Sequence, residues 1–108
     1  MILTILTMRT SAPRTVEVIQ ALRVLTRAAR AEKGFVTCHL CLEADDANTI
    51  HYEERWQTGE DFEDQLRSPR YTRLLALMES ASEPPSLEFH FISETRGLEY
   101  VADVRGEG

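Results

Sequence analysis

The alternation of apolar and polar residues predicts strands and helices along the whole chain. Residues 2–8 (ILTILTM) form a β-rich run, and Ser11 and Pro13 then indicate the start of a helix expected over 15–32. The apolar residues of this helix recur at spacings of three and four: Val18, Leu22, Leu25 and Ala29. Lys33-Gly34 supplies its C-terminal stop.

A β-hairpin is expected next, with strands over 34–43 and 48–56 separated by the turn-forming ADDA at 44–47. Pairing Glu43 with Asn48 sets its register. One face then carries four opposed pairs: Phe35 and Trp56, Thr37 and Glu54, His39 and Tyr52, and Cys41 and Ile50. The other face carries Val36, Cys38, Leu40 and Leu42 beside Thr49, His51, Glu53 and Arg55.

The second half of the chain predicts two helices and two strands. Thr58 and the following GED open a short helix, and Ser68-Pro69 begins a second one that EPP at 83–85 ends. The second helix carries an apolar stripe at helical spacing: Tyr71, Leu74, Leu75, Met78 and Ala81. Strands are expected over 87–94 and 98–104.

The order β-α-β-β-α-β with an extra terminal strand predicts an α+β fold, the ferredoxin-like split βαβ antiparallel sheet covered by helices on one side. We interpret residues 1–108 as a single domain, with a core over 1–94 and a C-terminal strand and tail over 95–108. The uncovered sheet face would expose an apolar patch: Val36, Cys38, Leu40 and Leu42. Because a monomer rarely exposes such a patch, we expect a homodimer, sheet against sheet, with the last strand contacting the partner subunit.

Composition narrows the class of partner. The chain has 12 basic and 18 acidic residues and a net charge of −6, which disfavours nucleic acid. The N-terminal run MILTIL is far shorter than the roughly 20 residues that span a bilayer, and it lacks a basic segment and a cleavage site. We therefore expect a cytoplasmic protein with no membrane partner.

The two cysteines, Cys38 and Cys41, have the CxxC spacing of redox and metal sites. On a strand, however, residues three apart point to opposite faces, so these two thiols cannot chelate one ion. The sequence therefore predicts two small buried residues and no metal site.

The corner between the hairpin and the next helices resembles the antibiotic biosynthesis monooxygenase family. YEERW, followed by FEDQLRSPRYTRLLALM, is similar to the Glu-x-Trp strand end, acidic short helix and Ser-Pro-aromatic helix start of that family. The matching residues are Glu54, Trp56, Ser68, Pro69 and Tyr71, and Gly34-Phe35 matches the opening of its second strand.

The resemblance implies a dimeric α/β barrel that oxidises a small aromatic, a quinol or polyketide-type phenol, with O₂ and no metal, flavin or other cofactor. Many members carry a histidine nine residues after the tryptophan, where this chain has Gln65. Glutamine forms hydrogen bonds but is no base near neutral pH. Haem degradation is disfavoured, because the first strand lacks the asparagine and the helix over 69–81 lacks the histidine of that branch.

His39 is the candidate base, since the ordinary pKa of histidine suits proton transfer at neutral pH. The candidate substrate pocket is made of five other residues: Tyr52, Glu54, Trp56, Gln65 and Tyr71. Three of them have a structural alternative: Trp56 as a core anchor, Tyr71 as core with its hydroxyl at the rim, and Glu54 capping a helix or pairing with an arginine. His39 is alternatively a cross-strand neighbour of Tyr52.

The sequence is compatible with two functions. The chain is either a cofactor-independent monooxygenase or a non-catalytic dimeric module that binds a small molecule or stabilises an assembly. His51 and His90 are interpreted as surface or interface residues. Three further residues are interpreted as a solvated helix face, or else as a landing site for an anionic ligand: Arg67, Arg70 and Arg73.

Overall fold

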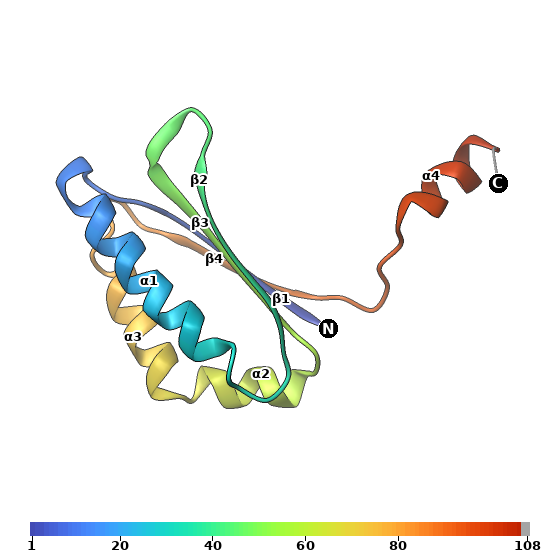
Figure 1. The fold of residues 1–108 in the computed structure, drawn as a ribbon, viewed down its shortest axis with the longest axis horizontal. Helices are drawn as coiled ribbons and strands as arrows, with labels where there is room; N and C mark the ends of the chain where they lie inside the picture. The colour runs from blue at the N-terminus through green and yellow to red at the C-terminus, as the bar shows by residue number, and fades with distance from the viewer. Residues whose placement is uncertain (107–108) are drawn as a thin grey trace.

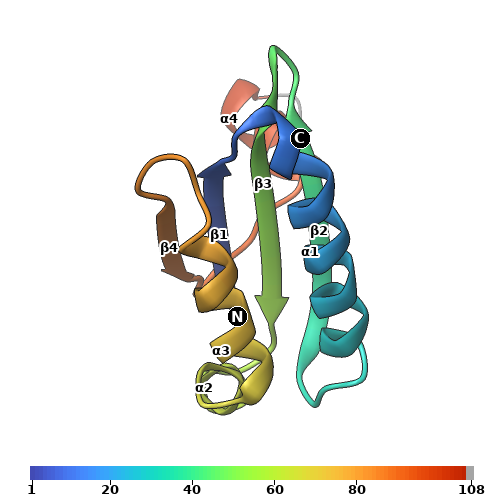
Figure 2. The ribbon, with the colours of Figure 1, turned by 90° about the vertical axis from the view of Figure 1, so that its left-hand side faces the viewer.

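The chain folds into one antiparallel sheet with helices packed on one of its faces (Figure 1). The computed structural model describes residues 1–106. The elements are β1 (Ile2–Arg9), the 3₁₀ turn η1 (Ala12–Arg14), α1 (Thr15–Ala29), β2 (Phe35–Glu43), β3 (Asp46–Trp56), α2 (Gly59–Leu66), α3 (Pro69–Met78), β4 (Ser86–Phe91) and α4 (Leu98–Arg105). The sheet order β2-β3-β1-β4, visible in Figure 2, confirms the ferredoxin-like α+β fold.

Local sequence signals explain where the helices start and stop. The Thr58 and Ser68 hydroxyls cap α2 and α3 by accepting hydrogen bonds from the backbone N–H groups of Asp61 and Tyr71. α1 ends at Ala29, three residues earlier than expected. The chain then turns through Gly34, whose φ of 84° favours glycine.

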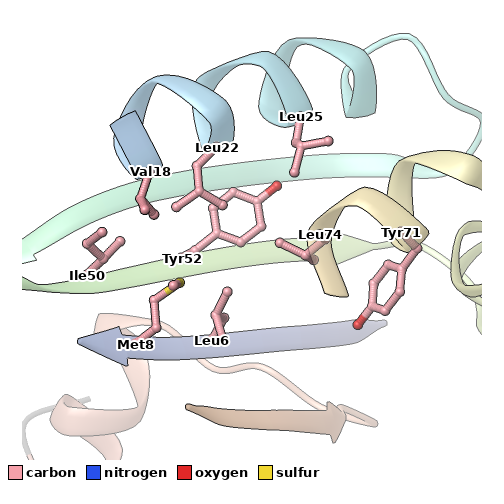
Figure 3. Packing of buried hydrophobic residues seen from close by; sticks show 9 residues of the cluster. All are labelled: Leu6, Met8, Val18, Leu22, Leu25, Ile50, Tyr52, Tyr71 and Leu74. Atoms are coloured by element: carbon pink, nitrogen blue, oxygen red, sulfur yellow. The ribbon is translucent and has the colours of Figure 1, made fainter. Parts of the chain in front are cut away.

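The main core lies between the sheet and the α1–α3 pair (Figure 3). It joins every second residue of β1 and β3 to the apolar stripes of the two helices: Leu6, Met8, Val18, Leu22, Leu25, Ile50, Tyr52, Tyr71 and Leu74. A smaller cluster around Trp56 continues this layer toward α2: Ile2, Ala29, Trp56 and Phe62. The helices thus cover the face of β3 that also carries the candidate site.

The predicted hairpin register is right only at its open end. Phe35 pairs with Trp56 as expected, but a bulge between Phe35 and Thr37 inserts one extra residue on β2. From there on β2 is shifted by one position, so the other three expected pairs are wrong. The observed pairs are Thr37 with Arg55, Cys38 with Glu54, His39 with Glu53, Leu40 with Tyr52, Cys41 with His51 and Leu42 with Ile50.

The shift exchanges the two faces of β2, because neighbouring strand residues point to opposite sides. Cys38 and Leu40, which we expected on the open face, are half-buried against the main core. The expected apolar patch of the open face is therefore wrong as composed. That face carries Thr37, His39 and Cys41 instead.

The C-terminal segment is the other correction. β4 ends at Phe91, and the strand expected over 98–104 is the helix α4. The Glu99 side chain accepts a hydrogen bond from Gly97 N–H at 2.8 Å and closes a helical first turn. α4 has no buried residue and extends away from the sheet (Figure 1). Within residues 1–106, every helix is too short or too polar to cross a membrane.

Candidate functional site

Three candidate residues follow one another on the helix-facing side of β3. Tyr52, Glu54 and Trp56 occupy every second position, so their side chains point to the same face. The exposed fractions are 0% for Tyr52, 1% for Glu54 and 0% for Trp56. A carboxylate so deeply buried needs partners to offset its lost hydration.

Glu54 receives hydrogen bonds on both oxygens. Arg70, in the first turn of α3, donates from its two terminal nitrogens to Oε2 at 2.8 Å and to Oε1 at 3.0 Å. Trp56 Nε1 donates to Oε1 at 2.9 Å, and the Tyr52 hydroxyl donates to Oε2. Gln65 Oε1 in turn accepts from Arg70 Nε at 3.1 Å. The candidate pocket residues on β3 and α2 therefore form one hydrogen-bonded network, completed by Arg70.

The surroundings of Tyr52 and Arg70 favour the protonated forms of both side chains. Burial, followed by the charge of Glu54, raises the pKa of Tyr52 well above its ordinary value, so the hydroxyl remains a donor. Burial lowers the pKa of Arg70, but hydrogen bonding to Glu54 and the charge of that carboxylate outweigh this effect and raise it overall. The bidentate ion pair is the geometry that arginine favours with carboxylates.

This arrangement suits anchoring better than proton transfer. The Glu54 carboxylate already accepts four hydrogen bonds, which leaves it little capacity to take a proton from a ligand. The indole of Trp56 packs edge-on against Phe35, at a centroid distance of 5.9 Å, and lies 5.7 Å from the guanidinium of Arg70. Trp56 thus acts as a core anchor, and Glu54 pairs with an arginine, as the structural alternatives predicted.

Tyr71 joins the same layer from α3 but stands outside the network. Its side chain points from α3 toward β1 (Figure 3) and is 3% exposed. Its hydroxyl is buried and makes no hydrogen bond to another residue of the described chain. Burial, then the charge of Glu54, raises the pKa of Tyr71 to about 12. The hydroxyl is therefore buried in the core and does not lie at a pocket rim, where the sequence had led us to expect it.

The structure does not bring His39 to these residues. His39 pairs with Glu53, is exposed and lies on the open face of the sheet, so its expected position opposite Tyr52 is wrong. His51 is half-buried beside Glu43, and His90 is exposed beside Glu88. Within residues 1–106, no group of three or more His, Cys, Asp and Glu side chains could hold a metal ion.

Arg70 is the functional residue that sequence reasoning misjudged. Arg67 and Arg73 are exposed as expected, but Arg70 is only 6% exposed and completes the network. A signal was present, because Arg70 precedes the core residue Leu74 by four positions and so shares its side of α3. A charged residue on the apolar side of a helix needs a buried partner, and Glu54 is that partner.

A hollow of the surface lies beside this network, between α1 and β2. This α1–β2 groove has a volume of about 540 Å³. Its inner part is formed by half-buried side chains: Ile19, Thr26, Cys38 and Leu40. Its outer part is formed by exposed residues, which include three arginines: Arg23, Arg27 and Arg30. A second hollow, of about 530 Å³, lies between α1 and α3 and is lined mainly by apolar residues.

Cys38 connects the groove to the network. Burial raises the pKa of the Cys38 thiol, while hydrogen bonding to Tyr52 and Thr26 lowers it in part. The same interaction with Cys38 contributes to the raised pKa of Tyr52. A ligand against the inner wall of the groove would therefore touch a thiol that is coupled to the Tyr52–Glu54–Arg70 network.

The chain is similar to a known protein family in sequence and to solved structures in fold. The profile of the family described as antibiotic biosynthesis monooxygenase matches residues 1–77. No curated protein sequence matches the chain.

Solved structures are similar at low sequence identity. A Deinococcus radiodurans protein, provisionally named an antibiotic biosynthesis monooxygenase, superposes with a TM-score of 0.82 at 16% identity, over 91% of this chain and 98% of its own. A Nitrosomonas europaea protein with the same provisional name has a TM-score of 0.75 at 18% identity, over 87% of this chain and 100% of its own. A Mycobacterium tuberculosis protein has a TM-score of 0.77 at 16% identity, over 89% of this chain and 98% of its own. These likenesses establish a shared fold.

Proposed function

Since the chain belongs to the antibiotic biosynthesis monooxygenase family, we propose that it oxidises a small aromatic, a quinol or polyketide-type phenol, with O₂ and without a cofactor. In this reaction one oxygen atom enters the ring as a carbonyl and the other leaves as water. The observation that supports the proposal most directly is the α1–β2 groove, which has apolar residues inside and arginines outside. Such a groove places an electron-rich ring against apolar side chains and beside the positive charge of the arginines.

The proposed roles follow from position. A phenol reacts with O₂ most readily after its proton has passed to solvent water at the exposed outer part of the groove, and nearby guanidinium groups favour the resulting anion. Cys38 and Leu40 would hold the ring. The five pocket residues Tyr52, Glu54, Trp56, Gln65 and Tyr71 would act behind that wall, by fixing β3 against α2 and α3. The mechanism assigns no proton transfer to His39, which faces the other side of the sheet.

Oxygen uptake tests the proposal. We expect the protein to consume O₂ with an acidic phenol or an anthrone under air, and to form the corresponding quinone in equal amount. Filling the groove with a Leu40→Trp variant should abolish uptake, whereas a His39→Ala variant should keep the wild-type rate. Loss of uptake in His39→Ala with retention in Leu40→Trp would overturn the groove as the site and favour His39 as the base.

A second function is favoured by the saturated state of Glu54. The network contains no histidine, and its one carboxylate is engaged by four donors. These features suit a non-catalytic module that binds a small aromatic in the same groove. Binding of a substrate analogue without O₂ uptake across the panel of phenols and anthrones would select this alternative.

We also propose that the protein is a homodimer in which the C-terminal arm, residues 92–106, packs on the second copy. α4 leaves its apolar side chains in water, with Leu98 82% and Val104 69% exposed. Apolar surface of this kind is ordinarily covered by a partner. The arm is the main support for the dimer, because Cys38 and Leu40 of the apolar patch first expected on the open face pack against the core instead.

Light scattering tests the assembly. We expect twice the chain mass of 12.3 kDa at micromolar concentration. A variant combining Leu98→Asp and Val104→Asp should shift the protein toward the monomer, while Asp103→Ala, on another side of α4, should not. A wild-type protein that scatters as a monomer would contradict the proposed dimer.

A further inference from the structure

Three arginines form a row of positive charge along one side of α1. Arg23 and Arg27 are four residues apart, and Arg30 follows three residues later, so consecutive members are neighbours on the helix surface. All three line the α1–β2 groove. Like charges at this spacing repel one another. The row therefore concentrates positive charge along one side of the groove.

No acidic residue of the described chain offsets this charge. The guanidinium groups of Arg23, Arg27 and Arg30 make no ion pair or hydrogen bond to another residue within 1–106. The chain has more acidic than basic residues overall, with a net charge of −6. The protein is acidic overall, but these three arginines make the edge of the groove positively charged.

The inner part of the same groove is of the opposite character. Ile19 and Leu40 are apolar, and the Cys38 thiol remains neutral at physiological pH because burial raises its pKa. The Thr26 hydroxyl donates to the Leu22 carbonyl at 2.9 Å, so its proton is already committed. The volume of about 540 Å³ is within the range of pockets that hold a small organic ligand.

We propose that the α1–β2 groove binds small aromatic anions, with the ring against Cys38 and Leu40 and the carboxylate or phenolate on the Arg23–Arg27–Arg30 row. The inference rests on the proposed function only for the claim that this anion is the substrate. A guanidinium group binds a planar oxyanion through two parallel hydrogen bonds, which a neutral ring cannot match. The groove therefore selects for charge at the outer end and for an apolar ring at the inner end.

The size of the row favours a small ligand over a macromolecule. Three arginines on one short helix face neutralise few phosphates, and the net charge of −6 would repel a nucleic acid. The arginines and the apolar wall also line a single hollow, so one ligand of limited length can reach both.

The test uses two redox-inert probes of the same shape, 2-naphthoate and its neutral amide, 2-naphthamide, with the full-length protein and isothermal titration calorimetry. We expect naphthoate to bind at least tenfold more tightly than the amide, and its Kd to rise with added salt. Arg27→Gln, at the centre of the row, should raise the naphthoate Kd about tenfold and leave the amide Kd unchanged.

Arg73→Gln is the matched control, because Arg73 is an exposed helical arginine that lines the second hollow between α1 and α3. It should leave both Kd values unchanged. Equal Kd values for the two probes, or an Arg73→Gln effect as large as that of Arg27→Gln, would overturn the proposed site. A shift of Arg27→Gln from dimer to monomer with unchanged naphthoate binding would also overturn it, since the row would then serve a second copy of the chain.

The outcome is separable from that of the proposed oxidation. Naphthoate binding that depends on Arg27, together with no O₂ uptake for any phenol or anthrone, would support the anion site and contradict the oxygenase. O₂ uptake by the wild type, together with a naphthoate Kd that Arg27→Gln leaves unchanged, would support the oxygenase and contradict the anion site.

Discussion

We expect the Arg70→Met variant to lose about 3–5 kcal/mol of unfolding free energy, because it leaves the Glu54 carboxylate buried without its charged partner. Glu54 is 1% exposed, and Arg70 donates to both of its oxygens. Methionine keeps much of the apolar volume of arginine, so the loss reports the charge more than a cavity. Urea unfolding at neutral pH, followed by the fluorescence of the single Trp56, measures it.

Two further variants make this measurement specific. Arg67→Met breaks an exposed pair with Asp64 at 3.3 Å and should cost less than about 1 kcal/mol. Adding Glu54→Gln to Arg70→Met removes the unpaired charge and should recover about half of the loss. If Arg70→Met and Arg67→Met unfolded at the same urea concentration, the buried ion pair would not hold the helices on the sheet as the geometry indicates.

Periodicity predicted most elements because burial of one face imposes it. The alternation in β1 and the three-and-four spacing in α1 both arise from contact with the same core. Thr58 and Ser68 were identifiable as caps because their hydroxyls satisfy backbone donors that any helix start leaves free. Both requirements are met by residues close together in the sequence, so the sequence alone predicts them.

The hairpin register could not be predicted in the same way. A bulge between Phe35 and Thr37 changes the face of every later β2 residue, and no residue type in that stretch indicates it. The change exchanged His39 for Cys38 on the helix-facing side. It therefore removed the candidate base from the site and placed a thiol in the wall of the α1–β2 groove.

The groove itself depends on tertiary arrangement. Arg23, Arg27 and Arg30 are recognisable in the sequence as the polar side of α1, but only the packing of α1 over β2 makes them one rim of a hollow. Arg70 was predictable in principle from its spacing to Leu74, whereas its partner on β3 was not. Sequence therefore located the corner that Trp56 anchors, and packing determined which side of it can receive a ligand.

The two buried tyrosines should respond in opposite ways to loss of the hydroxyl group. Tyr52→Phe should lower the unfolding free energy by about 1.5–3 kcal/mol, because the Tyr52 hydroxyl donates to the charged Glu54. Tyr71→Phe should leave it unchanged or raise it by up to about 1 kcal/mol, because the Tyr71 hydroxyl is buried without a partner among the described residues. Urea unfolding at pH 7 compares the two variants, each of which removes one oxygen atom.

Alkaline pH gives an independent check on Tyr71. Its pKa is raised from an ordinary value of 10.0 to about 12, so the unfolded chain releases this proton before the folded one. The stability associated with the neutral hydroxyl is therefore complete below pH 10 and is lost as the pH rises toward 12. Between these values wild type should lose more stability than Tyr71→Phe. Parallel loss in both proteins would mean that the Tyr71 hydroxyl is solvated in solution, and the layer between α3 and β1 would then be open to water.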